Sequence, residues 1–417
     1  ELSNPQVRVH QTTEALQTGD RYELIEELAS GSMGTVWLAN DRLLAREVAV
    51  KILNKKYENS HEARVRFEYE ARLTGRLDHP GIVPVYDLGQ LPDGRWYFAM
   101  RRIQGSDLRE RLNEILARSE GEYPLQSLLR LFSQICMILA YAHDRGFIHR
   151  DIKPANILVG NYGELYIADW GIAKTHLPNT NDIDAFLLLE ADSVPGTLIG
   201  TVRYMAPEQV TGEIDQLSPR SDAFSLGSLL YEIVTGKTPF SGKKLIDLMQ
   251  SIIDCKINPM TIMPDGRLVP LELREICQDV LKPNPSDRIS VVDLAKRVDT
   301  YLDGIEARRR SMKRAQENID VGREAMDAYE SAMVTLSSSM ASISNAEKQL
   351  REQPLMADAI GSGLALAPYL DIWQRKHEIE ESKHAAEHLY TRAVQSLEKA
   401  LEDHSTPEVH SLLADLY

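Results

Sequence analysis

The chain has 417 residues, of which 43% are hydrophobic and 26% are charged, proportions that are ordinary for a globular protein. This length suggests two or three domains, each large enough to bury a core. The formal net charge of −15 argues against a nucleic-acid groove as the main function, because neutralising phosphates needs clustered Lys and Arg.

The first part of the chain predicts a small, strand-rich lobe. Residues 1–20 are polar and without a pattern, so we expect a flexible arm. From residue 21 to 103, short β-prone runs alternate with turn residues, and a helical pattern at 61–77 is closed by Pro80. Strands are expected at 22–29, 34–40, 46–53, 82–88 and 96–103.

Helical patterns dominate from residue 104 to 303 and predict a second, larger lobe. The clearest pattern runs from 125 to 145, where five apolar residues share one face: Leu128, Leu131, Ile135, Leu139 and Ala142. A strand-rich lobe followed by a helical lobe predicts an α+β fold with a ligand cleft between the two lobes.

The last part of the chain, residues 304–417, predicts an all-α region. A long helix with a heptad repeat is expected over 306–352 and a second long helix over 369–402. Two arrangements remain open: an antiparallel hairpin packed within the chain, or a seam that forms a homodimer with a second copy. Residues 389–417, a Tyr-x-x-Ala helix, a Pro turn and a Leu-Leu-Ala-x-Leu-Tyr helix, resemble the junction between two tetratricopeptide repeats. The heptad positions are Met312, Ile319, Met326, Met333 and Met340, interleaved with Ala315, Tyr329, Leu336, Ile343 and Leu350.

Cysteines and hydropathy bear on the environment of the protein. Cys136, Cys255 and Cys277 have no short paired spacing, so we expect reduced thiols in a cytoplasmic protein. No run of eighteen apolar residues occurs, which predicts no membrane span in this chain. Because the sequence starts at Glu1 and stops in mid-pattern at Tyr417, we expect a fragment of a longer protein, with any signal or anchor outside it.

A loop of small residues lies between the first two expected strands. Residues 29–36, Ala-Ser-Gly-Ser-Met-Gly-Thr-Val, would let backbone N–H groups approach phosphates, and we call them the phosphate loop. Lys51 follows in the middle of an apolar strand, where a cation is costly to bury unless an anion and a carboxylate receive it. Glu70 fits that carboxylate, and Glu68 points to another face of the same helix. A solvated helix glutamate remains the alternative for Glu70.

The segment 149–156, His-Arg-Asp-Ile-Lys-Pro-Ala-Asn, is followed thirteen residues later by Asp-Trp-Gly at 169–171. We call residues 149–156 the catalytic loop. Asp151 offers a proton-accepting carboxylate, Lys153 a cation, and Asn156 with Asp169 two oxygen ligands. This set suits phosphoryl transfer from a nucleotide. The two oxygen ligands predict a hard cation, Mg²⁺, with Mn²⁺ as an alternative.

Two further segments extend the pattern: His-Pro-Gly-Ile-Val-Pro-Val-Tyr-Asp at 79–87 and Gly-Thr-Val-Arg-Tyr-Met-Ala-Pro-Glu at 200–208. With them the chain resembles the eukaryotic-like Ser/Thr protein kinases of bacteria, over about residues 21–303. The resemblance implies a bilobal protein kinase fold, with an N-lobe at 21–103 and a C-lobe at 104–303. It also implies transfer of the ATP γ-phosphoryl group to Ser or Thr hydroxyls of protein substrates, with Asp151 orienting the hydroxyl and Lys153 offsetting charge.

The same resemblance implies roles for other residues. Backbone groups from Arg101 to Ile103 would bind adenine, and Asp107 is either a ribose contact or the cap of the next helix. His149 would be a packing residue and Asp222 a support of the catalytic-loop backbone. The implied nucleotide-binding residues are Leu28, Ala29, Gly31, Ser32, Gly34, Val36, Ala49, Lys51, Glu70, Met100, Ile103 and Asp107. Glu208 and Arg288 are the implied buried ion pair of the large lobe.

Three positions depart from the family pattern. Ala29 replaces the first glycine of the phosphate loop, Trp170 replaces a phenylalanine, and Arg101 stands where an acidic residue is common. None of these changes removes a catalytic group, so an active enzyme is expected.

The segment between Gly171 and Ala206 is long and acidic, and its phosphate acceptors are predicted to be Ser193, Thr197 and Thr201. We expect autophosphorylation near Thr197, with Arg150 receiving the phosphate and ordering the segment. An acidic segment that mimics the phosphate remains the alternative. Thr201 is also expected to contact the catalytic loop directly.

The sequence is also compatible with functions other than that of a kinase. The main alternative is a catalytically inactive scaffold whose helical or repeat region binds partners. A kinase of small molecules is disfavoured, because the Ala-Pro-Glu segment at 206–208 belongs to a platform for protein substrates. The helical region at 304–417 is expected to regulate the kinase.

Overall fold

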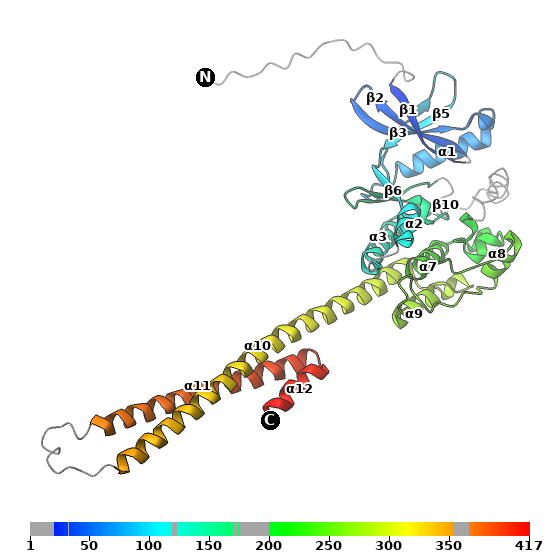
Figure 1. Ribbon diagram of the computed structural model, residues 1–417. Coiled ribbons are helices and arrows are strands. Elements are labelled where there is room, and N and C mark those ends of the chain that lie inside the picture. Colours follow the sequence, from blue (N-terminus) through cyan, green and yellow to red (C-terminus); the bar gives the residue numbers. More distant parts are fainter. Residues whose placement is uncertain (1–20, 32, 119–122, 171–173, 176–199, 353–366) are drawn as a thin grey trace, which may run out of the picture. The chain divides into compact units, whose positions relative to one another are not determined.

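The computed structural model describes residues 21–31, 33–118, 123–170, 174–175, 200–352 and 367–417 (Figure 1). The predicted arm at 1–20 lies outside the described residues. The chain divides into two compact units, the first ending at Leu302 and the second beginning at Asp303.

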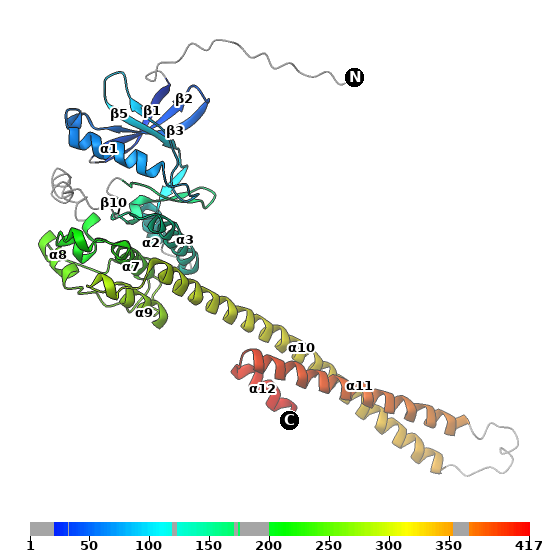
Figure 2. The same cartoon turned by 180° about the vertical axis from the view of Figure 1, so that it is seen from behind.

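A five-stranded antiparallel sheet forms the N-lobe of the first unit, in the order β1-β2-β3-β5-β4. Helix α1 (His61–Thr74) lies against this sheet (Figure 2), and its Phe67 and Ala71 share a buried cluster with Leu53 and Phe98. The short helix η1 (Lys55–Tyr57) connects the sheet to α1. The strands are β1 (Tyr22–Ser30), β2 (Gly34–Asp41), β3 (Arg46–Leu53), β4 (Val85–Gln90) and β5 (Trp96–Arg101).

Three elements of the N-lobe have boundaries that differ from the prediction by two or more residues, and one of them is β5, which ends at Arg101 rather than at residue 103. Helix α1 ends at Thr74 rather than at residue 77, because Gly75 caps it through its N–H bond to the Ala71 carbonyl. Leu77 is instead buried in the core of the C-lobe. The strand expected at 82–88 begins three residues later as β4, since Ile82 pairs alone with Ile167 in an isolated bridge.

The C-lobe is built around α7 (Pro219–Thr235), which is buried along almost its whole length. Helix α3 (Leu125–Asp144) packs beside it and buries the face predicted from the sequence, except for the half-buried Leu131. The short strands carry the catalytic loop between them. The remaining elements are β6 (Gly105–Asp107), α2 (Leu108–Ala117), β7 (Phe147–Ile148), η2 (Pro154–Asn156), β8 (Ile157–Gly160), β9 (Leu165–Ile167), β10 (Lys174–Thr175), α6 (Pro207–Val210), η3 (Ile214–Gln216), α8 (Leu245–Ile253), α9 (Leu271–Val280) and η4 (Pro285–Asp287).

Among the described helices, α3 alone is long and apolar enough to cross a membrane, with a mean hydropathy of 1.4 over its best window. However, 61% of that window is buried inside the protein. Packing in the C-lobe core therefore accounts for the apolar character of α3.

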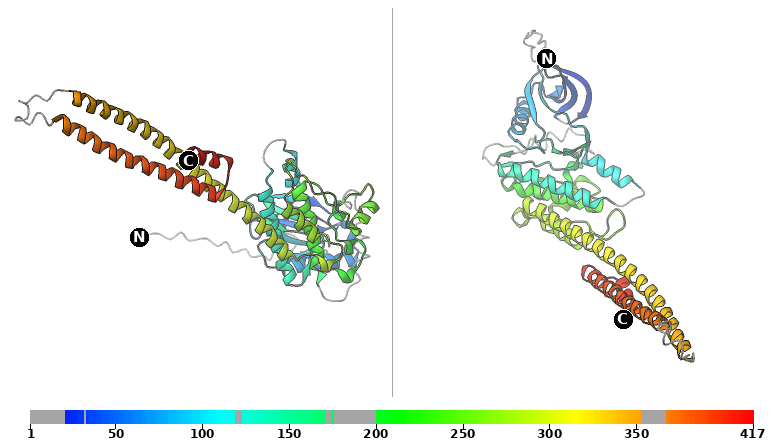
Figure 3. Two further views of the ribbon diagram at one scale, coloured as in Figure 1. Left: turned by 90° about the horizontal axis from the view of Figure 1, so that it is seen from below. Right: turned by 90° about the vertical axis from the view of Figure 1, so that its left-hand side faces the viewer.

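The described residues of the second unit lie mainly in three helices: the part of α10 (Val291–Glu352) from residue 303 onward, α11 (Ala367–Asp403) and α12 (Pro407–Leu416). Helix α11 runs back along α10 (Figure 3), and α12 folds onto the pair. The helix predicted at 306–352 is thus the continuation of one that begins at Val291. Of the prolines and glycines expected to separate the two long helices, Pro354, Gly361 and Gly363 lie outside the described residues, whereas Pro368 is the second residue of α11.

The contacts between α10 and α11 show an antiparallel hairpin packed within the chain. Met326 packs on Leu397, and Gly322 lets the Leu397 side chain come close to α10. Ile379 shares a buried cluster with Leu336 and Ile343 near the other end of the hairpin. Part of the heptad seam is left at the surface, because Met312, Met333 and Met340 are 53%, 41% and 42% exposed. Homodimerisation through this seam stays a prediction.

Leu397 provides a test of this hairpin, because its side chain is fully buried. Replacing it with alanine removes packing and leaves a cavity, so Leu397→Ala should destabilise the second unit by about 2–5 kcal/mol. Leu370→Ala on the same helix is the control, because Leu370 is 57% exposed. Thermal unfolding of the full chain, followed by circular dichroism, would measure both, and equal shifts in Tm would contradict this packing.

Candidate active site

Lys51 joins three elements of the first unit. Its strand, β3, runs between β2 and β5 and is buried on both faces from Val48 onward. The Nζ atom of Lys51 lies 2.6 Å from Oε1 of Glu70, on α1, and 3.1 Å from Oδ1 of Asp169, which follows β9. Glu70 is only 3% exposed. It is therefore not the solvated glutamate of the alternative interpretation.

The electrostatics of this cluster favour the charged forms of Lys51 and Asp169. Burial by itself would lower the pKa of Lys51, but the charges of Asp169 and Glu70 outweigh it and raise that pKa. Lys51 in turn lowers the pKa of Asp169. Burial raises the pKa of Glu70, although Lys51 opposes this effect. Lys51 is thus held as a cation beside the Asp169 carboxylate.

Asp169 and Asn156 could hold a divalent cation. The side chain of Asp169 is 57% exposed, whereas that of Lys51 beside it is 11% exposed. Asn156 uses its Nδ2 to donate to the carbonyl oxygen of Asp151 at 2.8 Å, which leaves its Oδ1 as an acceptor. Two oxygen ligands of this kind fit Mg²⁺, which takes its other ligands from phosphates and water. The described residues contain no group of three or more His, Cys, Asp or Glu side chains arranged for a metal.

The catalytic loop presents Asp151 between two donors. Lys153 Nζ and Asn156 Nδ2 each lie 2.9 Å from Oδ2 of Asp151. Lys153 Nζ also lies 2.9 Å from the hydroxyl oxygen of Thr201. This bond joins the catalytic loop to the 200–208 segment. Because Thr201 is only 4% exposed, its hydroxyl is poorly placed to receive a phosphate.

Asp222, at the start of α7, binds the backbone of the catalytic loop. Its two carboxylate oxygens accept the backbone N–H groups of His149 and Arg150, each at 2.8 Å. Arg150 has a φ of 68°, a left-handed conformation that is strained for a residue with a side chain. His143 Nε2 lies 2.7 Å from Asp222 Oδ2. Burial acts to raise the pKa of Asp222, but these contacts lower it.

His149 is a buried packing residue, as the resemblance implied. Its Nε2 lies 3.0 Å from the carbonyl oxygen of Ala168, and its Nδ1 accepts the backbone N–H of Asp151 at 3.2 Å. These roles require the neutral ring with its proton on Nε2. Burial lowers the pKa of His149, which agrees with a neutral ring.

Trp170 fixes the loop that carries Asp169. Its ring packs on the edge of His149 with centroids 4.6 Å apart, and its indole N–H donates to the Ile167 carbonyl at 3.2 Å. A phenylalanine could not make this hydrogen bond. Asp169 has a φ of 60°, a strained backbone conformation that persists only where the surroundings hold it. Its two neighbours are held, Ala168 by the bond to His149 and Trp170 by the bond to Ile167.

The N-lobe sheet brings together the residues expected around a nucleotide. Ala49 and Met100 are paired on neighbouring strands, and Ala29 pairs with Val36 at the end of the β1–β2 hairpin. A Cβ on Gly34 would lie 2.8 Å from the Ile52 carbonyl oxygen, so glycine is required there. Leu28 is 45% exposed, next to this loop. Ser32 lies outside the described residues.

The segment after β5 contains the predicted adenine contacts. The backbone N–H of Arg101 is bonded to the Pro84 carbonyl, and Ile103 is half-buried. Asp107 caps α2, because its carboxylate accepts the backbone N–H of Glu110 at 2.9 Å. The structure therefore shows the cap, and a ribose contact by Asp107 stays a prediction.

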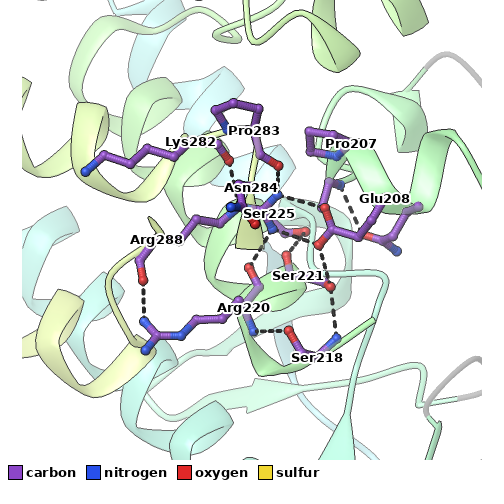
Figure 4. Close-up of polar contacts among 12 residues, drawn as sticks. Pro207, Glu208, Ser218, Arg220, Ser221, Ser225, Lys282, Pro283, Asn284 and Arg288 are labelled. Carbon is purple, nitrogen blue, oxygen red and sulfur yellow. Dashed lines mark hydrogen bonds and ion pairs between the residues drawn. The ribbon is translucent and has the colours of Figure 1, made fainter. Parts of the chain in front are cut away.

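The ion pair of Glu208 and Arg288 is fully buried and bidentate (Figure 4). Both guanidinium nitrogens of the Arg288 fork lie 2.7 Å from Glu208 oxygens, and the Ser221 hydroxyl donates to Glu208 at the same distance. Carbonyl oxygens of Lys282, Pro283 and Arg220 accept further N–H groups of Arg288. This network ties α6 to the segment before α10.

Two partly buried contacts were missed in the sequence analysis. His143 supports Asp222, and Arg109 joins Tyr204 to Glu232 across α2, the 200–208 segment and α7. Both involve single polar residues on helices far apart in the chain, so no local motif marks them. A buried charge in an apolar helix, such as Glu232 in α7, was the available signal.

The predicted phosphate acceptors Ser193 and Thr197 lie outside the described residues. Arg150, expected to receive the phosphate, is 8% exposed and its carbonyl accepts a bond from Gln209 Nε2 at 2.8 Å. Its role toward a phosphate stays a prediction.

Comparison with known proteins agrees with this geometry. The sequence model of the family described as protein kinase domain matches residues 22–298 of this chain. The serine/threonine-protein kinase PknD of Chlamydia trachomatis serovar L2b is 35% identical over 303 residues, covering 68% of this chain and 32% of PknD. The serine/threonine-protein kinase PknA of Mycobacterium tuberculosis is 38% identical over 272 residues, covering 64% of this chain and 58% of PknA.

A second PknD, from Protochlamydia amoebophila, is 33% identical over 300 residues, covering 68% of this chain and 30% of that protein. The chain therefore spans about a third of the length of these chlamydial relatives. The family match ends at residue 298, before the second unit begins.

The buried ion pair yields a stability prediction. Arg288→Ala leaves the Glu208 carboxylate buried without its counter-charge, so it should cost about 3–5 kcal/mol of unfolding free energy. Arg297→Ala is the matched control, because its pair with Asp279 is 35% and 37% exposed and should contribute less than about 1 kcal/mol. Urea unfolding would compare the variants. Equal losses would contradict the role given to Arg288.

His149 yields a prediction about pH. The folded protein keeps its ring neutral, whereas the unfolded chain takes up a proton below its ordinary pKa of 6.5. The unfolded state then binds more protons, so stability falls as the pH drops from 7 toward 5, by up to about 1.4 kcal/mol per pH unit. His149→Gln should flatten this dependence, and urea unfolding at several pH values measures it. His61→Gln is the control, since His61 lies exposed at the start of α1. A slope unchanged in His149→Gln would contradict the assignment.

Proposed function

The chain belongs to the protein kinase domain family, and on that premise we propose that it is a protein-serine/threonine kinase. It transfers the γ-phosphoryl group of ATP to Ser or Thr hydroxyls of protein substrates. The observation that carries this proposal is the convergence of three side chains from different elements. Nζ of Lys51, on β3, lies 2.6 Å from the Glu70 carboxylate on α1 and 3.1 Å from the Asp169 carboxylate after β9. The catalytic loop supplies the second half of the machinery in the same lobe as Asp169.

Each group has a defined part in the transfer. Lys51, oriented by Glu70, binds the phosphates at the inner end of the nucleotide. Asp151 accepts a hydrogen bond from the substrate hydroxyl and takes up its proton as the oxygen attacks phosphorus. Lys153 holds the Asp151 carboxylate in place and offsets negative charge on the transferred group. Since the phosphates carry most of the charge, these positions contribute mainly by electrostatic stabilisation.

We propose Mg²⁺ as the metal, with Mn²⁺ as the alternative. Asp169 and the Oδ1 of Asn156 would hold it, and the metal neutralises charge on the phosphate oxygens when bound. The exposed carboxylate of Asp169 and the fixed amide of Asn156 support this choice.

The proposal includes regulation by phosphorylation and by the second unit. Autophosphorylation at Ser193 or Thr197 would order the acidic segment between Gly171 and Ala206 through Arg150. The helices of the second unit would regulate or recruit protein partners, either as the start of a tetratricopeptide array or as a contact between two copies. A cytoplasmic location is supported by three free cysteines, two of them buried.

The alternative, an inactive scaffold, has less support. It requires the loss of Lys51, Asp151 or Asp169, and all three are present with the contacts described above. Partner binding by the helical region would then be an additional activity of an active kinase.

Catalysis can be tested directly. Incubation with labelled ATP and Mg²⁺ should label the wild-type chain and an added protein substrate. Lys51→Met and Asp151→Asn should each lower the rate by about 10²–10⁴-fold, because each removes a charge that acts on the reacting groups. Lys55→Met, a nearby exposed lysine, is the control and should keep the wild-type rate.

Two further measurements on the same samples address regulation. Peptide mapping would locate phosphate on Ser193 or Thr197, and light scattering would give the mass in solution. Equal labelling of the wild type and both active-site variants would reject the kinase. A labelled chain without phosphate between residues 172 and 205 would reject the proposed activation step alone.

A further inference from the structure

The tip of the phosphate loop has few bonds of its own. Pairing between β1 and β2 ends at Ser30 and Thr35. Beyond it, the described part of the turn is closed by one backbone bond, from the Gly31 N–H to the Gly34 carbonyl at 2.9 Å. A turn at the end of a two-stranded hairpin is expected to be mobile unless other groups hold it.

Asn54 supplies such groups from a different strand. It directly follows β3, whose pairing with β2 ends at Gly34 and Leu53, so its side chain lies beside the turn. Its Nδ2 donates to the Gly31 carbonyl at 2.9 Å, and its Oδ1 accepts the Thr35 hydroxyl at 3.0 Å. Its backbone N–H donates to the Met33 carbonyl at 3.0 Å. One residue therefore contacts both sides of the turn.

These contacts also set the direction of the peptide groups. A peptide group is planar and trans, so its carbonyl and the following N–H point in opposite directions. Because the Met33 carbonyl points to Asn54, the N–H of Gly34 points away from it. Carbonyl oxygens that are bonded to Asn54 cannot face an incoming phosphate, where their negative charge would oppose binding.

We propose that Asn54 is a positioning residue for the phosphate loop, which sets the affinity of the enzyme for the triphosphate of ATP. The inference rests on the proposed function, because it requires that residues 29–36 bind phosphates. Asn54 does not touch the nucleotide. It lowers the cost of ordering the loop when phosphates bind, which is the effect of preorganisation. The role also fits a loop in which Ala29 replaces a glycine, since the remaining freedom lies at Gly31 and Gly34.

The test compares nucleotides with and without phosphates, using the full chain. The variants are Asn54→Ala, Thr35→Val and the double variant, with Asn40→Ala on β2 as a matched control of the same residue type. Calorimetry would measure the Kd of ADP with Mg²⁺ and the Kd of adenosine. Steady-state assays would give the KM for ATP and kcat, and thermal unfolding would confirm that each variant folds.

Asn54→Ala should raise the Kd of ADP with Mg²⁺ and the KM for ATP by about three- to tenfold, the range expected for the loss of one or two hydrogen bonds. The Kd of adenosine and kcat should stay within about twofold of the wild type, since adenosine makes no phosphate contact. Thr35→Val should weaken ADP binding in the wild-type background and have no effect in the Asn54→Ala background, because its hydroxyl acts through Asn54.

Three results would overturn the inference: an unchanged Kd for ADP, an equal loss of adenosine binding, or additive effects of Asn54→Ala and Thr35→Val. If Asn54→Ala does not fold, Thr35→Val alone decides, because it removes one bond and keeps the side-chain volume. Binding is measured without turnover. A wild-type chain that binds ADP but transfers no phosphate would therefore reject the proposed function and still decide the role of Asn54.

Discussion

A single buried ammonium group organises the cleft. Lys51 lies in a strand that is buried on both faces, where an isolated charge would be too costly to keep. Two carboxylates compensate it, and they come from different parts of the fold: Glu70 from the N-lobe helix and Asp169 from the C-lobe. The position of α1, the closure of the lobes and the orientation of Asp169 thus depend on the same charge. Any movement of α1 away from the sheet would leave Lys51 short of one partner.

In the C-lobe, buried contacts stabilise a strained backbone at two residues. Arg150 and Asp169 both have left-handed φ values, and both lie in the proposed active site. Asp222 binds the backbone at Arg150, and His149 with Trp170 orders the residues on both sides of Asp169. Such strain persists only where the surroundings fix it in several ways. The buried polar groups below the loop are therefore part of the active site, although they touch no substrate.

The second unit follows a simpler rule, since it is held by apolar contacts between helices. Near Leu397 the hairpin has three layers, because α12 adds its leucines to the cluster of α10 and α11. Farther along, Ile379 and Ile372 of α11 pack against the buried Leu336 and Ile343 of α10. A two-helix hairpin covers a narrow stripe of each helix, which explains why Met333 and Met340 stay partly exposed.

The sequence by itself determined the family of the fold and indicated the candidate reacting groups. Lys51, Asp151, Asn156 and Asp169 could be proposed because the chemistry of phosphoryl transfer requires particular residue types at particular spacings. The tertiary structure decided what depends on contacts between distant segments. It selected Glu70 as the partner of Lys51, gave Asp107 the role of a helix cap, and ended α1 at Thr74. It also revealed His143 below the catalytic loop and the hairpin within the chain. The reason is physical: a local pattern records which face of an element is apolar, whereas burial, counter-charges and packing partners exist only once the elements are brought together.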